Sequence, residues 1–570
     1  LGRTGEAVVR LEPACSRNPG VAALHNELGL CHAAEGAYGA ALACYDRALA
    51  LTPDSPVLHN NRGNALRILG HPAAAARALR RALERDPDYA DACANLGNVL
   101  RQLGRPLQAI ACFELAGRLD PGNTLARVNA MHEKKQQCLW DQSPDARERE
   151  LREMPHAATA RAAPTPLSVV DLVDDPAFQR HAAELYGAAK YPPRPLEPAC
   201  SRRVDDGRDE RIRVGYFSAD FHDHATMHLM ARVFELHDRD RFEIRAFSFG
   251  PDRQDAMRTR LLANVDGFHD VRGLTHRGIA QLARDLGIDI AVDLKGYTEF
   301  ARTEIFAWRA APVQVNFLGF PGTSGLPYMD FVLADSVVAP PGTEAFFSER
   351  IVRMPHSYQP NDDRRAIAPR IPCRSEAGLP ERGFVFCCFN NSYKISAREF
   401  DVWMRLLVQV EGSVLWLLET HPRATANLRR EAAARGVDPA RICFAPRRPL
   451  PEHLARHQLA DLFLDTFNYN AHTTASDALW AGLPVLTRAG RSFAARVAAS
   501  LLTAAGLPEL VTTDTNAYEQ LALRLAREEG LLEALRQRLR LQRHTSPLFD
   551  TQRYTRDLET AYVRMLESAT

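Results

Sequence analysis

Two short segments of the 570-residue chain contain residue types that hold phosphate groups. FNNSYK at 389–394 follows an apolar run that predicts a strand, so Lys394 stands at that strand's carboxyl end. HTT at 472–474 opens a predicted helix after another apolar run, and the N–H groups and dipole of a helix start attract anions. Parallel strands end at one edge of a sheet, so these segments predict a pyrophosphate clamp. The alternatives are that Thr473 only caps a helix and that Lys394 lies in solvent.

A third segment, SADFHDHATMHL at 218–229, follows the first predicted strand of the α/β region and is rich in titratable groups. Five residues carry them: His222, His224, His228, Asp220 and Asp223. No H-E-x-x-H spacing is present, so the cluster indicates proton transfer or ligand binding rather than a metal site. We expect one of the three histidines to be functional and the other two to be structural or at the surface.

Three further segments are weaker candidates. The glycines of GFPGTSG at 319–325 would let a ligand approach the backbone, although a plain tight turn explains them equally well. GYTEFAR at 296–302 is another loop at a strand end, of unknown role. His453 lies with Arg456 in a short predicted helix, where it could stack on a flat ring or be a surface residue.

The scaffold for these segments is an alternation of predicted strands and helices from residue 211 onward, with a break near 357–380. The strands are RIRVGYFSAD, FEIRAFSFG, IDIAVDL, VQVNFLGF and MDFVLADS, then FVFCCFN, SVLWLLE, RICFAP, DLFLDTF and LPVLT. Two such runs predict two doubly wound, Rossmann-like lobes, at 206–372 and 373–546, followed by a final helix at 547–570. Neither lobe opens with G-x-G-x-x-G and no P-loop occurs, which disfavours dinucleotide oxidoreductases and P-loop enzymes.

The first part of the chain, 1–130, repeats itself every 34 residues. The series are Pro19, Pro53, Pro87 and Pro121; Gly29, Gly63 and Gly97; and, in one large apolar slot, Tyr45, Leu79 and Phe113. This is the tetratricopeptide helix-turn-helix pattern, and it predicts an α-superhelix whose concave wall binds peptides or partner proteins. Asn61 and Asn95 could bond an extended peptide there, or be solvated surface residues. Residues 131–205 are predicted as a helical linker, closed by DDGRDER at 205–211.

Composition excludes several classes of function. A formal charge of +1 gives no overall field toward nucleic acid or an anionic membrane, and no apolar run is long enough to span a bilayer. The 11 cysteines are scattered without a C-x-x-C pair, which favours reduced thiols and a cytoplasmic location. Leu1 already lies inside a repeat, so we expect the natural chain to extend upstream of it.

Taken together, these motifs resemble the O-GlcNAc transferase family, whose members join tetratricopeptide repeats to two Rossmann-like lobes. The matching segments are RVGYFSADFHDH, VDLKGYT, LGFPGTSG, FNNSYK, SVLWLLE, HTTASDALWAG and RVAAS. The resemblance covers about 1–570, with poor correspondence in 131–205, and the short repeat array with its Arg-rich composition is similar to a bacterial member.

The resemblance implies an inverting, metal-independent GT-B glycosyltransferase that moves GlcNAc from UDP-GlcNAc to Ser or Thr hydroxyls of proteins held by the superhelix. It assigns the diphosphate to Lys394, His472, Thr473 and Thr474, the ribose to Asp477, and the uracil site to His453 and Arg456, with Asn391 beside the nucleotide. His224 matches a histidine near the reacting centre, as base or as positioning group. No cofactor and no metal are implied.

Three residues depart from the pattern of animal members. Leu450 stands in place of a Lys that contacts the base, Tyr469 in place of a small Cys, and Asn391 in place of a Gln. A bulky Tyr469 could narrow the sugar pocket or change the donor. Two alternatives therefore stay open: a GDP-fucose protein O-fucosyltransferase of the same family, and a catalytically weak tetratricopeptide scaffold.

Overall fold

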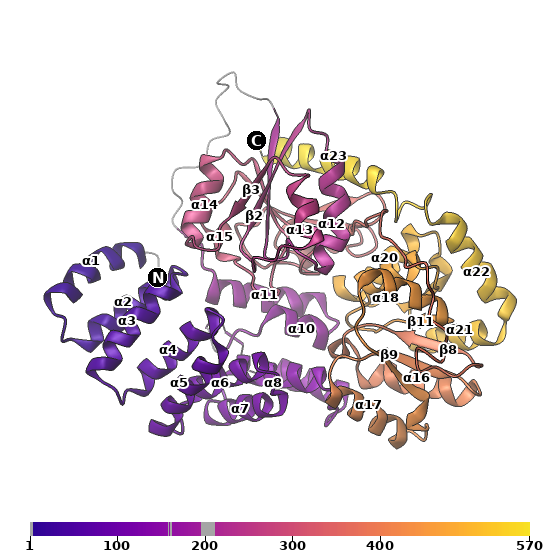
Figure 1. Cartoon of the computed structure of the whole chain (residues 1–570), viewed down its shortest axis with the longest axis horizontal. Coiled ribbons are helices and arrows are strands. Elements are labelled where there is room, and N and C mark those ends of the chain that lie inside the picture. Colours follow the sequence, from indigo (N-terminus) through magenta and orange to yellow (C-terminus); the bar gives the residue numbers. More distant parts are fainter. Residues whose placement is uncertain (1–3, 155, 158, 160–161, 195–210, 570) are drawn as a thin grey trace.

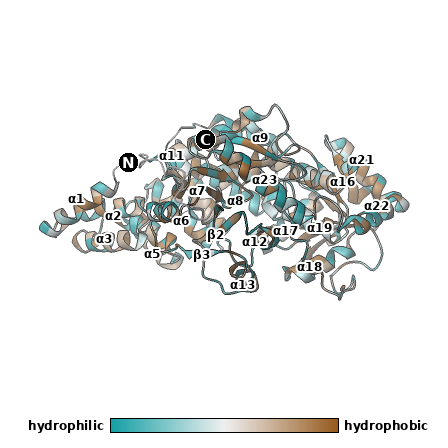
Figure 2. Ribbon diagram, turned by 90° about the horizontal axis from the view of Figure 1, so that it is seen from above, coloured by the Kyte–Doolittle hydropathy of each residue, from teal (hydrophilic) through white to brown (hydrophobic). Residues whose placement is uncertain are grey.

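The chain is an elongated molecule with a helical superhelix at one end and two α/β lobes beside it (Figure 1). The computed structural model describes residues 4–154, 156–157, 159, 162–194 and 211–569. Seen from above, helices α1–α3 lie at one extremity and α16, α21 and α22 at the other (Figure 2). Within the described residues, no helix is both long and apolar enough to traverse a lipid bilayer.

The superhelix consists of paired antiparallel helices, as the repeat predicts. Its helices are α1 (Thr4–Arg17), α2 (Ala22–Ala34), α3 (Tyr38–Leu51), α4 (Pro56–Ile68), α5 (Pro72–Arg85), α6 (Ala90–Gln102), α7 (Pro106–Leu119) and α8 (Thr124–Gln136). A Cβ on Gly97 would lie 2.7 Å from the Phe113 ring, and one on Gly63 would lie 2.6 Å from Leu79. The repeated glycine therefore lets the large residue of the partner helix pack directly against the backbone.

The stack continues through α8, beyond the predicted limit at residue 130, and then turns under the first lobe. The connecting helices are α9 (Pro144–Glu153), α10 (Pro166–Leu172) and α11 (Pro176–Lys190). Helices α10 and α11 lie between the superhelix and the lobes (Figure 1). The predicted limit at residue 205, and most of DDGRDER, fall outside the described residues.

The first lobe is a parallel sheet of seven strands in the order β3-β2-β1-β4-β5-β6-β7. Its elements are β1 (Ile212–Ser218), α12 (Ala225–Leu236), β2 (Phe242–Ser248), α13 (Ala256–Leu262), β3 (Gly267–Asp270), α14 (His276–Asp285), β4 (Ile290–Asp293), α15 (Glu304–Ala307), β5 (Val313–Asn316), β6 (Phe331–Asp335) and β7 (Arg350–Met354). All five predicted strands are present, and β3 and β7 are additional. Both lie at the edges of the sheet, where GFHD and RIVRM need no continuous apolar run.

The second lobe is a parallel sheet of six strands in the order β10-β9-β8-β11-β12-β13. Its elements are β8 (Val385–Cys388), α16 (Ala397–Gln409), β9 (Val414–Leu418), α17 (Pro422–Ala434), β10 (Ile442–Ala445), α18 (Leu450–Arg456), β11 (Leu462–Leu464), α19 (Thr473–Trp480), β12 (Val485–Arg488), α20 (Val497–Ala504), β13 (Val511–Thr512), α21 (Thr515–Arg527) and α22 (Glu529–Gln542). The short edge strand β13 is the one addition to the five predicted strands. A 3-10 turn at Phe493–Ala495 precedes α20.

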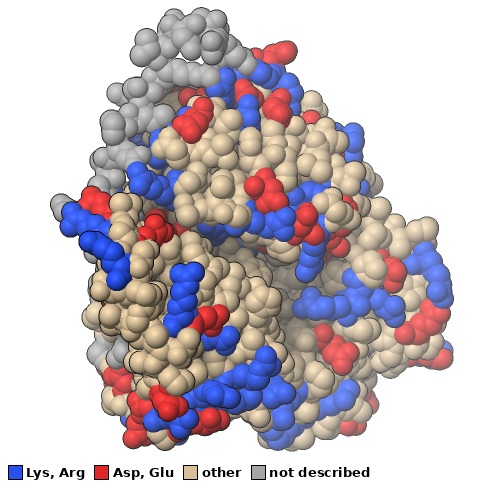
Figure 3. All heavy atoms as spheres, turned by 60° about the vertical axis from the view of Figure 1, so that its left-hand side comes forward, with Lys and Arg blue, Asp and Glu red and all other residues tan. Residues whose placement is uncertain are grey.

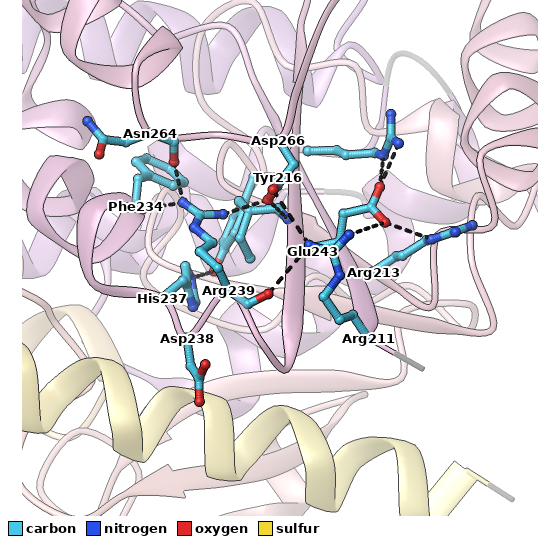
Figure 4. Close-up of polar contacts among 12 residues, drawn as sticks. Arg211, Arg213, Tyr216, Phe234, His237, Asp238, Arg239, Glu243, Asn264 and Asp266 are labelled. Carbon is cyan, nitrogen blue, oxygen red and sulfur yellow. Dashed lines mark hydrogen bonds and ion pairs between the residues drawn. The ribbon is translucent and has the colours of Figure 1, made fainter. Parts of the chain in front are cut away.

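The final helix, α23 (Thr551–Ala569), leaves the second lobe and packs back onto the first. Tyr562 meets Tyr216 of β1 with 3.0 Å between their hydroxyl oxygens, and Glu559 accepts a hydrogen bond from Nδ1 of His237 at 2.9 Å. The helix passes beside a network of Arg and acidic side chains at the amino ends of the strands, where Arg239 bonds Asp266 (Figure 4). The chain thus crosses between the lobes twice and ties them together.

Candidate functional site

A cavity of about 510 Å³ lies between the lobes, at the carboxyl ends of β1, β8 and β11. Every residue assigned from the sequence lines it: His224, Asn391, Lys394, His453, Arg456, His472, Thr473, Thr474 and Asp477. Tyr469 and Leu450, two of the departures from the animal pattern, line it as well. The position follows from doubly wound topology, because the carboxyl ends of parallel strands border a crevice where the strand order reverses.

Lys394 ends a 3-10 turn, Ser392–Lys394, immediately after β8, and only 8% of its surface is exposed. Its Nζ donates to the carbonyl of Asn470 at 2.7 Å and lies 3.9 Å from the ring centroid of Tyr469. Burial lowers the pKa of the Lys394 amine, and the nearby Asp465 carboxylate opposes that shift. An anion entering the cavity would therefore be attracted by the amine and would itself favour its protonated form.

Helix α19 begins at Thr473 with an open amino end. Its N-cap, His472, makes no side-chain cap, and the Thr473 hydroxyl has no hydrogen-bond partner among the described residues. The simple capping interpretation of Thr473 is therefore wrong. Thr474 is instead held by a bond from its hydroxyl to Oδ1 of Asn390. Burial, and then the charge of Lys394, lower the pKa of His472 well below its ordinary value, so this ring is neutral at pH 7.

Asp465 holds the loop between β11 and α19 in shape. Its Oδ1 accepts from the backbone N–H of Ala471 at 2.6 Å, and its Oδ2 accepts from the Thr487 hydroxyl at 2.6 Å. This carboxyl is fully buried, and burial raises its pKa. The loop that Asp465 supports presents the Asn470 carbonyl to Lys394. Asp465 therefore helps to position the carbonyl that binds the Lys394 amine.

At the other end of the cavity, Phe389, His453 and Arg456 form one wall, with the Phe389 and His453 rings tilted by 56° to each other. The Arg456 guanidinium lies 4.7 Å from the centroid of the Phe389 ring, and its Nη2 donates to Nδ1 of His453. Burial lowers the pKa of Arg456 to about 10, so it stays charged. Burial also lowers the pKa of His453, and the neutral ring carries its proton on Nε2 because Nδ1 accepts.

Between the two ends, Asp477 projects from α19 and is paired with Arg365 at 2.7 Å. Burial raises the pKa of Asp477 to about 6, and Arg365 opposes the shift. Arg365 was not predicted as part of the site, because it lies in the break between the two βα runs and no motif marks it. Arg365 does not itself line the cavity but binds Asp477, whereas Asn390 and Gln359 line it and were not predicted. Asn390 lies within the recognised FNNSYK motif, which could have suggested it.

The first lobe contributes His224, the N-cap of α12, whose side chain is 43% exposed. Its Nδ1 accepts from the backbone N–H of Thr226 at 3.2 Å and lies 3.5 Å from Oδ2 of Asp220. Lys295, from the VDLKGYT segment, donates to the same Asp220 oxygen at 2.8 Å. Burial lowers the pKa of His224, and Asp220 opposes the shift.

The other predicted segments of the first lobe divide between the cavity and the core. His228 also lines the cavity, with Nε2 2.8 Å from Asp223, whereas His222 does not. In GFPGTSG only Gly319 reaches the cavity, and Thr323 is bonded to Glu349. GYTEFAR packs away from the cavity, with Tyr297 among other tyrosines. Among the described residues, no three His, Cys, Asp or Glu side chains converge as a metal site requires.

The comparisons with known proteins agree with this architecture. The model of glycosyl transferase family 41 matches residues 199–371 and 364–558, and tetratricopeptide models match 28–95 and 66–134. A probable UDP-N-acetylglucosamine–peptide N-acetylglucosaminyltransferase of Arabidopsis thaliana is 39% identical over 366 residues, covering 63% of this chain and 38% of that protein. The Caenorhabditis elegans enzyme of that name is 30% identical over 478 residues, covering 64% of this chain and 41% of that protein.

Among solved structures, a mutant O-GlcNAc transferase from Thermobaculum terrenum is 30% identical, with a TM-score of 0.69. The match covers 100% of this chain and 99% of that one. The chain spans about two fifths of the length of the curated relatives above. One family model matches both lobes, and separate models match the repeats that precede them. The chain therefore belongs to glycosyl transferase family 41.

Proposed function

We propose that this chain is an inverting glycosyltransferase that moves N-acetylglucosamine from UDP-N-acetylglucosamine to Ser or Thr hydroxyls of proteins, without a metal. One observation carries the proposal: the buried amine of Lys394 and the open amino end of α19 line the same interlobe cavity. Two relatives of this chain are named for that reaction.

The cavity offers a place for each part of the donor. The wall of Phe389, His453 and Arg456 suits a flat base, and Asp477 offers carboxylate oxygens to a ribose. Lys394 with the N–H groups of α19 suits the diphosphate. These donors act where charge develops as UDP leaves, and removing one such donor typically costs about 2.7–4 kcal/mol of barrier.

In the proposed reaction the acceptor hydroxyl oxygen bonds to the anomeric carbon from the face opposite UDP, and the carbon–oxygen bond to the diphosphate breaks with its electron pair. We propose that His224 positions the hydroxyl rather than removing its proton. A backbone N–H can only donate, so the bond from Thr226 leaves Nδ1 of neutral His224 unprotonated and its proton on Nε2. The hydroxyl proton then passes to an oxygen of the departing diphosphate.

A GDP-sugar donor is the second candidate, favoured by Arg447 and Arg448 at the base end of the cavity. Arg447 donates to Oδ1 of Asn391 at 3.1 Å, and arginine is the side chain that pairs best with the O6 and N7 acceptors of guanine. GDP-fucose is then the donor to test. A catalytically weak scaffold would bind neither nucleotide.

The deciding experiment is a thermal shift with UDP, UDP-N-acetylglucosamine, GDP and GDP-fucose in the presence of EDTA. Ligand at 100 times its Kd stabilises a fold by about 2.7 kcal/mol, so UDP should raise the melting temperature measurably. Lys394→Met should weaken UDP binding about 10- to 100-fold, because a hydrogen bond to a charged group is lost. A shift with GDP alone would favour the fucosyl alternative, and no shift with any nucleotide would favour the scaffold.

The compartment and the acceptor complete the proposal. Ten cysteines of the described residues are free, which supports a reducing cytoplasmic environment. We propose that acceptor polypeptides approach along the superhelix. Its last helix, α8, directly contacts the turn Ser392–Lys394 that carries the proposed diphosphate ligand. The hydroxyl of Ser392, two residues before Lys394, donates to the carbonyl of Gln136 in α8 at 2.7 Å.

A further inference from the structure

A column of basic side chains runs along the first helices of the repeats. Arg67 in α4, Arg101 in α6 and Lys135 in α8 are 34 residues apart, so they occupy the same position of successive repeats. Three residues before each stands a second polar group: Asn64, Asn98 and His132 respectively. The repeat therefore presents the same pair of polar groups three times along one face.

The last pair of the column already binds a carboxylate. Asp171, at the end of α10, is fully buried, and its Oδ2 lies 3.0 Å from Nδ1 of His132 and 3.9 Å from Nζ of Lys135. Lys135 also donates to the backbone carbonyl of Asp171. One segment of the chain thus shows how an acidic residue and its backbone occupy this position of the repeat.

The two preceding pairs hold no carboxylate. Both guanidinium groups of Arg101 and Arg67 are bonded to amide oxygens, Nη2 of Arg101 to Asn98 at 3.3 Å and Nη2 of Arg67 to Asn64 at 3.0 Å. In the part of the chain that the structure describes, neither arginine has an ion pair within 4.0 Å. Burial and the charge of Arg101 lower the pKa of Arg67, as expected of cations without a counter-ion.

The charged groups near Arg67 and Arg101 do not neutralise these two arginines. Burial, and then the charge of Arg67, lower the pKa of Lys190 at the end of α11. Glu304 is taken by His276 at 3.1 Å and by Arg194. Glu133 is buried beside Arg101 and makes no ion pair with it within 4.0 Å. In the view of Figure 3, Lys and Arg side chains border the hollow in the middle of the molecule.

The column ends close to the interlobe cavity. The His132 ring lies 5.7 Å from the ring of Tyr393, and Tyr393 lines the cavity beside Lys394. The inner asparagines also take part in the face, although they bond other asparagines: Nδ2 of Asn61 donates to Asn26 at 3.0 Å and Nδ2 of Asn95 donates to Asn60 at 2.8 Å. A polypeptide bound at Arg67 and Arg101 therefore lies on the same face of the repeats as the position next to the cavity, which Asp171 already fills.

We propose that Arg67 and Arg101 bind Asp or Glu side chains of the acceptor polypeptide, in the way that His132 and Lys135 bind Asp171. The acceptor class is then a Ser- or Thr-containing segment with acidic residues on the side that lies in the superhelix. This inference rests on the proposed function for the identity of the bound polypeptide as acceptor. Guanidinium groups suit the role, because they bind carboxylates through two parallel hydrogen bonds.

The test uses the full chain and three fluorescent peptides that share one central Ser and differ in flanks of alternating glycine with Asp, Asn or Lys. Peptide Kd is measured by fluorescence anisotropy with UDP present, and transfer by mass spectrometry. The Asp peptide should bind about tenfold or more tighter than the Asn peptide, with a preference that falls as salt rises. The double variant Arg67→Gln, Arg101→Gln should erase the preference, and Arg67→Glu, Arg101→Glu should shift it to the Lys peptide.

Arg81→Gln is the matched control, because Arg81 is an exposed arginine on α5, a second helix of its repeat. It should keep the preference for Asp, and all variants should keep the UDP affinity of the parent. Equal binding of Asp and Asn peptides by the parent, or a preference that survives in the double glutamine variant, would overturn the inference. Sugar transfer to both peptides alike would do so while leaving the proposed function standing. Arginine-dependent binding of the Asp peptide without transfer from any donor would instead overturn the proposed function alone.

Discussion

The ammonium group of Lys394 lies 3.9 Å from the centroid of the Tyr469 ring, and both side chains line the interlobe cavity. The ring therefore orients the cation that we assign to the diphosphate. A cation over an aromatic face contributes about 0.5–2 kcal/mol, depending on how far it is desolvated.

Tyr469→Leu should accordingly weaken UDP binding by roughly 2- to 30-fold, because the ammonium group loses the ring that holds it. Tyr469→Phe keeps the aromatic face and should bind UDP as the parent does. Calorimetric titration of the two variants with UDP makes the comparison. Equal losses in both variants would point to the hydroxyl instead of the ring.

Replacement of His224 separates positioning from proton removal. His224→Gln retains an N–H donor at a similar reach and should keep kcat within about tenfold, whereas His224→Ala should lose more. A general base contributes typically 10²–10⁴-fold, so a glutamine variant as impaired as the alanine variant would identify His224 as the base. Steady-state transfer rates at saturating donor provide the measurement.

Fully buried His457 should make the second lobe sensitive to acid. Its Nδ1 donates to the carbonyl of His453 at 2.7 Å, and burial lowers its pKa to about 3. Its unfolded-state pKa is near 6.5, so the unfolded chain binds the extra proton and stability falls as pH drops below about 6.5 toward 3. Over this range, His457 should lower the free energy of unfolding by about 1.4 kcal/mol for each unit that the pH falls.

His457→Asn keeps a donor at the Nδ1 position and removes the titration. Urea unfolding at several pH values between 7.5 and 5 should show a shallower pH dependence for the variant than for the parent. An unchanged slope would mean that other buried histidines account for the acid sensitivity.

Gly97→Ala should destabilise the superhelix, because the new Cβ would lie 2.7 Å from the Phe113 ring. Overpacking of this kind costs about 1–3 kcal/mol. Gly39→Ala is the matched control, since Gly39 is the second residue of α3 and has nothing within 4 Å of the added Cβ. It should be neutral or slightly stabilising. Thermal unfolding followed by circular dichroism distinguishes the two variants.

Local patterns were sufficient for most elements of the fold. The 34-residue period identified the helix pairs because each glycine must meet one large residue, as Gly63 meets Leu79. Buried parallel strands were visible as apolar runs, whereas β3, β7 and β13 were not, because edge strands are short and partly exposed. The site residues were predictable where each ends a strand or starts a helix.

The chemistry of Lys394, the HTT helix start and the repeat array was determined by the sequence alone, because these depend on residue type and short-range spacing. Only the tertiary structure decided which distant groups meet. Arg365 pairs with Asp477, Lys295 stands behind Asp220, α23 returns to the first lobe, and Asp171 fills one position of the basic column. Such pairings join residues dozens to hundreds of positions apart, and their partners are set by how lobes and helices pack, which no local pattern encodes.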